Sequence, residues 1–202
     1  MHLDNKLIVT FALIGIRRIL SLAEPPISQF IEANMIPKFL EFLSWNSEPK
    51  IQFEASWSLT NVAVGTYDQV MTLVTKGAID GFIRLLTCCQ HVEIVEQAVW
   101  GLGNLSGESP KIRDLVIKAG AVQPIAEMLD RAVDSASDEF IKNLSWTLSN
   151  LCRGRPVPDP RLIERAVPSL AQVLLKKENP NVITDICWAF SYLCDNGSPT
   201  TM

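Results

Sequence analysis

Three tryptophans in this chain are each followed, four residues later, by an asparagine: Trp57/Asn61, Trp100/Asn104 and Trp146/Asn150. In an α-helix, residues four apart lie on one face, so each pair would present an indole and a carboxamide together. A carboxamide both donates and accepts hydrogen bonds, and it can hold the backbone of an extended peptide. Indole rings pack against aliphatic stems and attract cationic heads. The pairs therefore predict a surface for an extended chain rich in lysine or arginine.

A purely structural role is the alternative for any one pair, with the tryptophan as a core anchor and the asparagine as a helix cap. Repetition at one phase argues against it, because burying carboxamides without partners in successive helices is unfavourable. We therefore expect the asparagines to form an exposed ladder. Packed helices lie about 8–10 Å apart and an extended chain advances about 3.3 Å per residue, so three pairs would take roughly four to six ligand residues.

Four acidic residues lie near the tryptophans: Glu54, Glu96, Glu108 and Asp185. Any one of them could be an ordinary solvated charge, because exposed carboxylates need no function. Together with indole slots, they favour a site for lysine and arginine side chains.

The elements that position these residues repeat along the chain. A fourth tryptophan, Trp188, extends the series, and the four tryptophans are 43, 46 and 42 residues apart, a period typical of stacked helical repeats. Apolar residues recur at three- and four-residue spacing, without the alternation of strands. Within one repeat we expect a short helix in 109–120 that ends at Gly120, a second helix in 121–132, and then a longer helix that carries the tryptophan.

This pattern predicts an all-α fold, a right-handed α-solenoid whose stability comes from the stacking of neighbouring repeats. We expect a flanking helix at 6–22 and about four complete repeats, at about 24–65, 66–108, 109–154 and 155–196. The apolar run 7–16 is too short for a membrane span and lacks a signal-peptide cleavage site. It is expected to be a helix buried between neighbours.

Composition argues against several classes of function. A net charge of −4 and a pI near 5.2 leave no excess of lysine and arginine to neutralise phosphates, so we expect no nucleic-acid partner. The five cysteines and two histidines show no metal-ligand spacing, and no cofactor is expected. No nucleophile arrangement and no phosphate-binding glycine loop after a strand is evident, so the sequence does not predict an enzyme.

Five motifs, as an ordered set, resemble successive armadillo repeats of the importin-alpha (karyopherin-alpha) family: "IQFEASWSLTN", "EQAVWGLGN", "RDLVIKAGA", "WTLSNLCRG" and "CWAFSYLCD". The resemblance covers residues from about 14 to 197 and corresponds to the N-terminal half of that family's repeat domain. It implies an armadillo-repeat solenoid that binds classical nuclear localisation signals of cargo proteins. It further implies delivery of cargo with importin-beta and shuttling between cytoplasm and nucleus, with no membrane partner.

The resemblance also implies a role for each residue on the tryptophan faces. The three paired tryptophans would line pockets for lysine stems, and the three paired asparagines would hold the backbone of the signal. Gly65 would offer a carbonyl, and Glu108 a carboxylate, to the dominant lysine of the signal. Arg153 would pair with Asp185. Further candidates on the same faces are Gln97, Asn143, Trp188 and Tyr192.

Three positions depart from the pattern of the family. Glu108 stands where the family commonly has aspartate, Leu22 where it often has arginine, and Trp188 is followed by Tyr192 instead of asparagine. These departures suggest an altered cargo preference. No basic importin-beta-binding segment is evident before residue 6, and the repeats expected to hold the minor signal site and the export-factor contact are not evident after 197.

An armadillo scaffold of the catenin type is the alternative function. Grooves of that type bind acidic ligands and are lined by lysine and arginine. The face inferred here carries asparagine, tryptophan and acidic residues, which favours a basic ligand.

Overall fold

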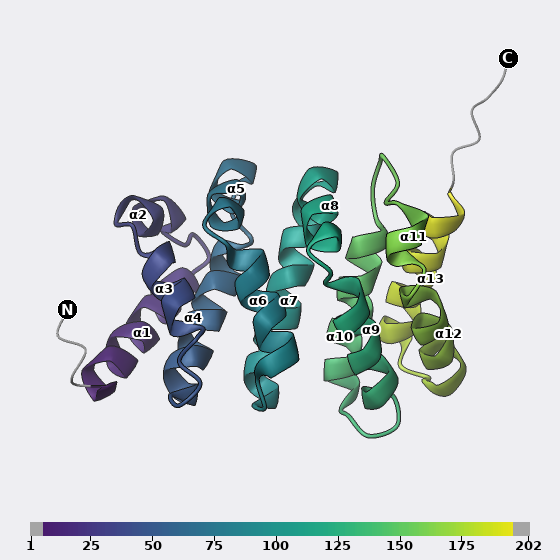
Figure 1. Cartoon of the computed structure of the whole chain (residues 1–202), viewed down its shortest axis with the longest axis horizontal. Coiled ribbons are helices and arrows are strands. Elements are labelled where there is room, and N and C mark those ends of the chain that lie inside the picture. Colours follow the sequence, from purple (N-terminus) through teal and green to yellow (C-terminus); the bar gives the residue numbers. More distant parts are fainter. Residues whose placement is uncertain (1–5, 196–202) are drawn as a thin grey trace, which may run out of the picture. The chain divides into compact units, whose positions relative to one another are not determined.

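The structure, a computed structural model, describes residues 6–195. These residues form thirteen α-helices and no strand (Figure 1), which confirms the predicted all-α class. The chain divides into two compact units, one ending at Leu105 and one beginning at Ser106. His2 and the last residue of the expected repeat 155–196 lie outside the described residues.

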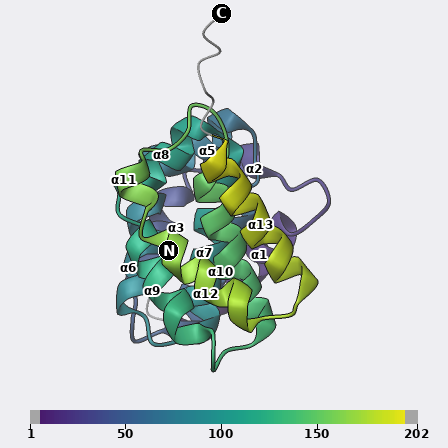
Figure 2. The ribbon, with the colours of Figure 1, turned by 90° about the vertical axis from the view of Figure 1, so that its right-hand side faces the viewer.

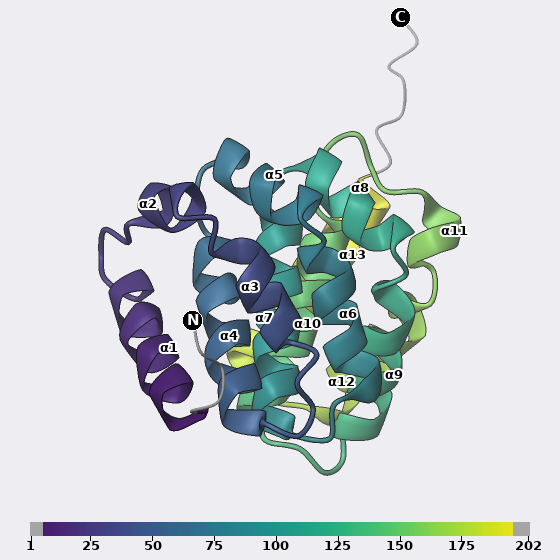
Figure 3. The same cartoon turned by 60° about the vertical axis from the view of Figure 1, so that its left-hand side comes forward.

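The first unit is a stack of helices around buried aromatic and aliphatic side chains. It contains α1 (Lys6–Leu20), α2 (Ile27–Glu32), α3 (Ile36–Phe42), α4 (Pro49–Val62), α5 (Tyr67–Thr75), α6 (Ala78–Cys88) and most of α7 (Val92–Glu108). Helix α4 packs against both α1 and α3 (Figure 3). Phe39, Leu59 and Phe82 are fully buried in this unit. No helix here can bury its apolar face alone, so the stack as a whole supplies the core.

Helix α1 departs from the expectation that the apolar run 7–16 is buried between neighbours. Val9 and Leu13 are buried, but Leu7, Ile8 and Phe11 are 63%, 63% and 65% exposed. The prediction was wrong for this face of the helix, because α1 packs on α4 through one side. A periodic apolar pattern shows which residues could be buried, and it does not show whether a neighbour covers them.

The second unit repeats the arrangement with different side chains. It contains the end of α7, then α8 (Pro110–Lys118), α9 (Val122–Ala132), α10 (Asp138–Cys152), α11 (Pro160–Ile163), α12 (Ala166–Lys176) and α13 (Pro180–Cys194). Helix α10 packs along α13, and α9 contacts α10 and α12 (Figure 2). The side chains of Ile125, Leu148 and Ile186 are fully buried.

Local signals explain where the helices begin and turn. Ser109 caps α8 by accepting a hydrogen bond from the amide of Ile112, and Pro110 occupies the first turn, as favoured by its fixed φ. Gly120 has a φ of 88°, which a glycine adopts without strain. Asn34 and Gly77 also have positive φ, and each lies 43 residues before the next of these turns. The helices predicted in 109–120 and 121–132 are confirmed as α8 and α9.

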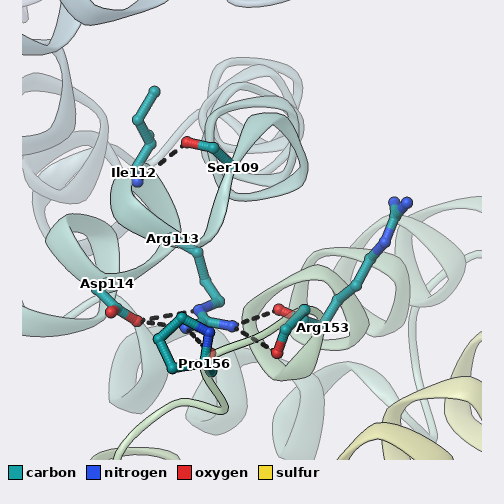
Figure 4. A network of polar contacts seen from close by, with 7 residues as sticks. Ser109, Ile112, Arg113, Asp114, Arg153 and Pro156 are labelled. Atoms are coloured by element: carbon teal, nitrogen blue, oxygen red, sulfur yellow. Dashed lines mark hydrogen bonds and ion pairs between the residues drawn. The ribbon is translucent and has the colours of Figure 1, made fainter. Parts of the chain in front are cut away.

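Arg113 is a buried cation that ties α8 to the loop after α10 (Figure 4). Its Nη1 donates to the carbonyls of Arg153 and Gly154 at 2.5 and 3.2 Å, and its Nη2 donates to that of Pro156 at 2.6 Å. The carboxylate of Asp114 balances the charge at 2.7 Å. The guanidinium therefore satisfies carbonyls that lie beyond the end of α10 and have no helical donor of their own.

Replacement of Arg113 by methionine should lower the free energy of unfolding by about 3 kcal/mol, because three main-chain carbonyls would lose a charged donor. Urea unfolding followed by circular dichroism would measure the change. Arg131→Met is the matched control, since Arg131 is exposed and its loss should cost less than about 0.5 kcal/mol. Equal stability of the two variants would contradict the assigned role of Arg113.

Candidate functional site

The predicted site residues lie on the tryptophan-bearing helices, except Gly65 and Arg153, which follow α4 and α10, and they are divided between the two units. The first unit holds Trp57, Asn61, Gly65, Gln97, Trp100 and Asn104. The second holds Glu108, Asn143, Trp146, Asn150, Arg153, Asp185, Trp188 and Tyr192. Each unit therefore carries its own indole and carboxamide face, and the two faces are described separately.

In the first unit, polar groups connect α4 to its neighbours. The Thr60 hydroxyl donates to the carbonyl of Gln97 at 3.0 Å, while the Thr60 carbonyl accepts from Nδ2 of Asn104 at 3.2 Å. Asn61 Nδ2 donates to the Ser21 hydroxyl at 2.8 Å. Each of these two carboxamides makes one hydrogen bond within residues 6–195 and is half-buried, which leaves a second N–H and Oδ1 for a ligand.

In the second unit, the side chain of Asn150 is more deeply buried than those of Asn61 and Asn104. Asn150 is 7% exposed, and a Cβ added to Gly107 would lie 3.2 Å from its Nδ2. The expectation of an exposed asparagine ladder is therefore wrong at Asn150. The physical reason is that the backbone of Gly107, which has no side chain, approaches the carboxamide closely and covers it.

The tryptophans differ in how much of the indole is accessible. Trp100 is 43% exposed and Trp188 is 53% exposed, whereas Trp57 and Trp146 are half-buried. Trp188 stacks on Tyr192 with ring centroids 5.6 Å apart. Among the four tryptophans of the series, Trp100 and Trp188 are therefore the most accessible to a ligand.

One indole is already covered by a cation from within the chain. The Arg17 guanidinium lies over the Trp57 ring, 4.2 Å from its centroid, and Arg17 Nε donates to Glu54 Oε2 at 2.5 Å. Phe53 meets the same indole edge-on, with centroids 5.5 Å apart. No such cation lies over Trp100 or Trp146 in the described part of the chain. Sequence reasoning named Glu54 and missed Arg17.

Three buried side-chain atoms within residues 6–195 lack a hydrogen-bond partner: Gln97 Oε1, Glu108 Oε2 and Ser145 Oγ. Buried polar atoms are almost always paired in folded proteins, so each exception calls for a partner. Two of the three belong to residues predicted for the site, and Ser145 directly precedes Trp146. Ser145 was missed because a serine within a helix carries no distinctive sequence signal.

Glu108 is the last residue of α7, a position at which a negative charge is unfavourable. The carbonyl end of a helix carries partial negative charge, so cations are stabilised there and anions are not. With one carboxylate oxygen buried and unpaired, Glu108 is suited to receive a cation. The chemistry available at this end of α7 is therefore charge-assisted hydrogen bonding to an ammonium or guanidinium group.

Asp185 supplies a second carboxylate, on α13. Partial burial raises the pKa of this carboxyl, and the positive charge of Lys142 acts in the opposite direction. Within residues 6–195 the expected ion pair between Arg153 and Asp185 does not form, and the Arg153 side chain is exposed. Its main-chain carbonyl accepts a hydrogen bond from Arg113 (Figure 4). A ligand cation beside Asp185 would favour its ionised form.

Gly65 and Asn143 are the remaining residues predicted for the site. Gly65 follows α4, and its amide donates to the carbonyl of Val62 at 3.1 Å. Asn143 is a half-buried residue of α10. Within residues 6–195 no helix is long and apolar enough to cross a membrane. No group of three or more histidine, cysteine or acidic side chains in that range could hold a metal ion.

Comparison with known proteins bears on the family of this chain. The Armadillo/beta-catenin-like repeat family matches residues 24–64, 66–107 and 109–153. Importin subunit alpha-1b of Oryza sativa subsp. japonica is 40% identical over 193 residues, covering 95% of this chain and 35% of the relative. Importin subunit alpha-2 of Arabidopsis thaliana has the same identity and the same coverage. The chain thus spans about a third of the length of these curated relatives.

Solved structures of engineered proteins share the fold. A designed armadillo-repeat protein in complex with the peptide (KR)4 has a TM-score of 0.79 and 25% identity, covering 94% of this chain and 77% of the design. A computationally designed armadillo-repeat protein for modular peptide recognition has a TM-score of 0.80 at 22% identity, with the same coverage. The chain therefore belongs to the armadillo/beta-catenin-like repeat family, and its sequence is similar to importin alpha subunits over part of their length.

Proposed function

We propose that the tryptophan faces of this protein bind Lys/Arg-rich nuclear localisation signals of cargo proteins, and that the protein acts as a nuclear import adaptor. In this proposal it is a binding protein and not an enzyme. It moves between cytoplasm and nucleus, and importin-beta is its partner in the delivery of cargo. The division into repeats at about 24–65, 66–108, 109–154 and 155–196 belongs to the same proposal.

The observation that carries the proposal is the pair of unsatisfied acceptors at Gln97 and Glu108. Both atoms accept hydrogen bonds and neither can donate one when Glu108 is ionised, so the missing partners are donors. Lysine and arginine side chains are donors without acceptors, and a backbone amide is a donor as well. A basic peptide supplies both kinds, whereas an acidic peptide supplies no side-chain donor.

The accessible indoles support the same class of ligand. Trp100 is 43% exposed and no cation from the described chain covers it, so the ring can pack on an aliphatic stem and attract its charged head. Among the similar structures, a designed armadillo-repeat protein was solved with a peptide of alternating lysine and arginine. The catenin-type alternative needs cationic side chains on these faces, and, apart from Gly65 and Arg153, the proposed contact residues are aromatic, amide or acidic.

Calorimetric titration with a Lys-Lys-Lys-Arg-Lys peptide tests the function directly. We expect micromolar or tighter binding, and loss of binding when the second lysine is replaced by threonine, because threonine lacks both the stem and the charge. Binding of an acidic peptide in place of the basic one would favour the scaffold function. No binding of the basic peptide would contradict the proposal.

Replacement of Trp100 by alanine should weaken binding of the same peptide by about 1–3 kcal/mol, because an exposed aromatic anchor would be lost from the interface. Trp45→Ala is the matched control. Trp45 packs against Phe42 with centroids 5.0 Å apart and lies outside the proposed faces, so its loss should leave the dissociation constant unchanged. A Trp100→Ala variant that is folded by circular dichroism and binds like the wild type would remove Trp100 from the site.

Glu108→Gln should weaken binding about 5- to 13-fold, since replacing a charge-assisted hydrogen bond worth about 1.5–3 kcal/mol by a neutral one worth about 0.5–1.5 kcal/mol costs about 1–1.5 kcal/mol. It should also reduce the dependence of affinity on salt, because one ionic contact disappears. Glu178→Gln, at an exposed position of the same unit, controls for the change of net charge. The same titration at two salt concentrations compares the variants, and identical isotherms for both would refute the role of Glu108.

A further inference from the structure

We propose that a groove between α1 and α4 binds a large apolar side chain of the ligand, so that the preferred ligand is a basic segment flanked by an aromatic or aliphatic residue. The inference rests on the proposed function and extends it to the residues beside the basic cluster. The groove lies within the first unit, where α1 packs along α4 (Figure 3).

The groove is large and mainly apolar. Its volume is about 620 Å³, within the range of about 300–1,000 Å³ that is typical of clefts that hold ligands. The apolar lining comes from Leu7, Phe11 and Ile14 of α1 and from Pro49 and Phe53 of α4. Leu7 and Phe11 are 63% and 65% exposed, so the described chain leaves much of this surface uncovered. An apolar side chain in the groove would remove it from water, which is favourable in proportion to the area covered.

The charges around the groove balance, which disfavours a charged occupant. Glu54 is 8% exposed and is already paired with Arg17. Lys50 and Glu93 are exposed and carry opposite charges, and His91 adds no formal charge at pH 7. The groove therefore offers no net charge to an acidic or a basic side chain, and an uncharged apolar residue suits its lining best.

The groove opens on the face of α4 that belongs to the proposed peptide site. Phe53, Trp57 and Asn61 follow one another at four-residue spacing, so they lie along one face of the helix. Phe53 lines the groove and also contacts Trp57 edge-on, with ring centroids 5.5 Å apart. A peptide held by Asn61 and Trp57 therefore has the groove directly beside it. This continuity favours the peptide itself as the source of the apolar side chain.

On α1, the groove and the other exposed apolar side chains lie on different faces. Leu7, Phe11 and Ile14 are four and three residues apart and share one face of the helix. Ile8 and Ile19, which are 63% and 49% exposed, are eleven residues apart and share another. A helix that packed on Ile8 and Ile19 would therefore contact α1 on a different side from the groove.

The distance between helices sets where the apolar residue lies in the ligand. Neighbouring helices pack about 8–10 Å apart, and an extended chain advances about 3.3 Å per residue. Passage from α4 to α1 therefore takes roughly two to three ligand residues. The apolar side chain should lie about that far outside the basic residue that contacts Trp57.

The test uses the peptide Lys-Lys-Lys-Arg-Lys with phenylalanine added at one end or the other, after a spacer of one, two or three serines. Matched peptides carry serine in place of phenylalanine. In calorimetric titrations of the whole chain, we expect phenylalanine at one of the two ends to strengthen binding about tenfold. A gain of less than about twofold for every peptide would overturn the role of the groove and leave the proposed function standing. Failure of every peptide to bind would overturn both.

Phe11→Ser should reduce the gain from phenylalanine to less than about threefold, because the groove loses apolar lining and acquires a hydroxyl group. Ile8→Ser is the matched control, since Ile8 is equally exposed on the same helix and lies outside the groove. It should keep the tenfold gain, and both variants should bind the unflanked peptide like the wild type. An undiminished gain in Phe11→Ser would contradict the proposal.

Two further measurements keep the test decisive if Phe11→Ser perturbs α1. In the wild type, the Ile14 Cδ1 methyl resonance, assigned by its loss in Ile14→Val, should shift on saturation with the phenylalanine peptide and not with its serine match. Equal shifts with both peptides would overturn the proposal. Sedimentation velocity tests a second copy of the chain as the occupant. A dimeric wild type and a monomeric Phe11→Ser would assign the groove to that copy and would also overturn the proposal.

Discussion

Polar atoms buried between closely packed helices need hydrogen-bond partners, and this requirement governs the structure. In the first unit the Thr60 hydroxyl donates toward the carbonyls of Ser56 and Gln97, each at 3.0 Å. In the second, Arg113 serves three carbonyls after α10. Arg113 and Thr60 both satisfy this requirement, so the unpaired atoms of Gln97 and Glu108 are informative exceptions. In the proposed function, the basic ligand supplies the missing partners.

Much of the fold could be predicted from periodicity and local signals. The spacing of tryptophans indicated the repeat, and the boundaries of α8 and α9 follow from Ser109, Pro110 and Gly120, whose effects are confined to a few residues. The exposed side of α1 and the burial of Arg113 could not be predicted. Both depend on what lies across a helix interface, and for Arg113 the partners are about 40 residues away in sequence.

The candidate site, too, could be predicted only in part from the sequence. Helical spacing identified the faces that carry Trp100 and Asn104, since that requires only the geometry of one helix. It did not predict the depth of Asn150, which depends on the approach of Gly107 from another helix. Arg17 left a signal that could have been read. Ile14 precedes Trp57 by 43 residues, the same spacing as from Trp57 to Trp100. Ile14 therefore occupies the position in α1 that corresponds to a repeat tryptophan, and Arg17 follows it by about one helical turn.

Arg17, Trp57 and Glu54 also show what the proposed recognition would look like in atomic detail. A guanidinium rests on an indole face at 4.2 Å while a carboxylate accepts its N–H at 2.5 Å, which is the arrangement proposed for a ligand cation. The cluster forms within the folded chain, without the loss of translational freedom that a separate peptide would incur. An intramolecular cation therefore has the advantage wherever the chain provides one. In the proposed function, a basic peptide would use indole surface that no internal cation covers, such as that of Trp100.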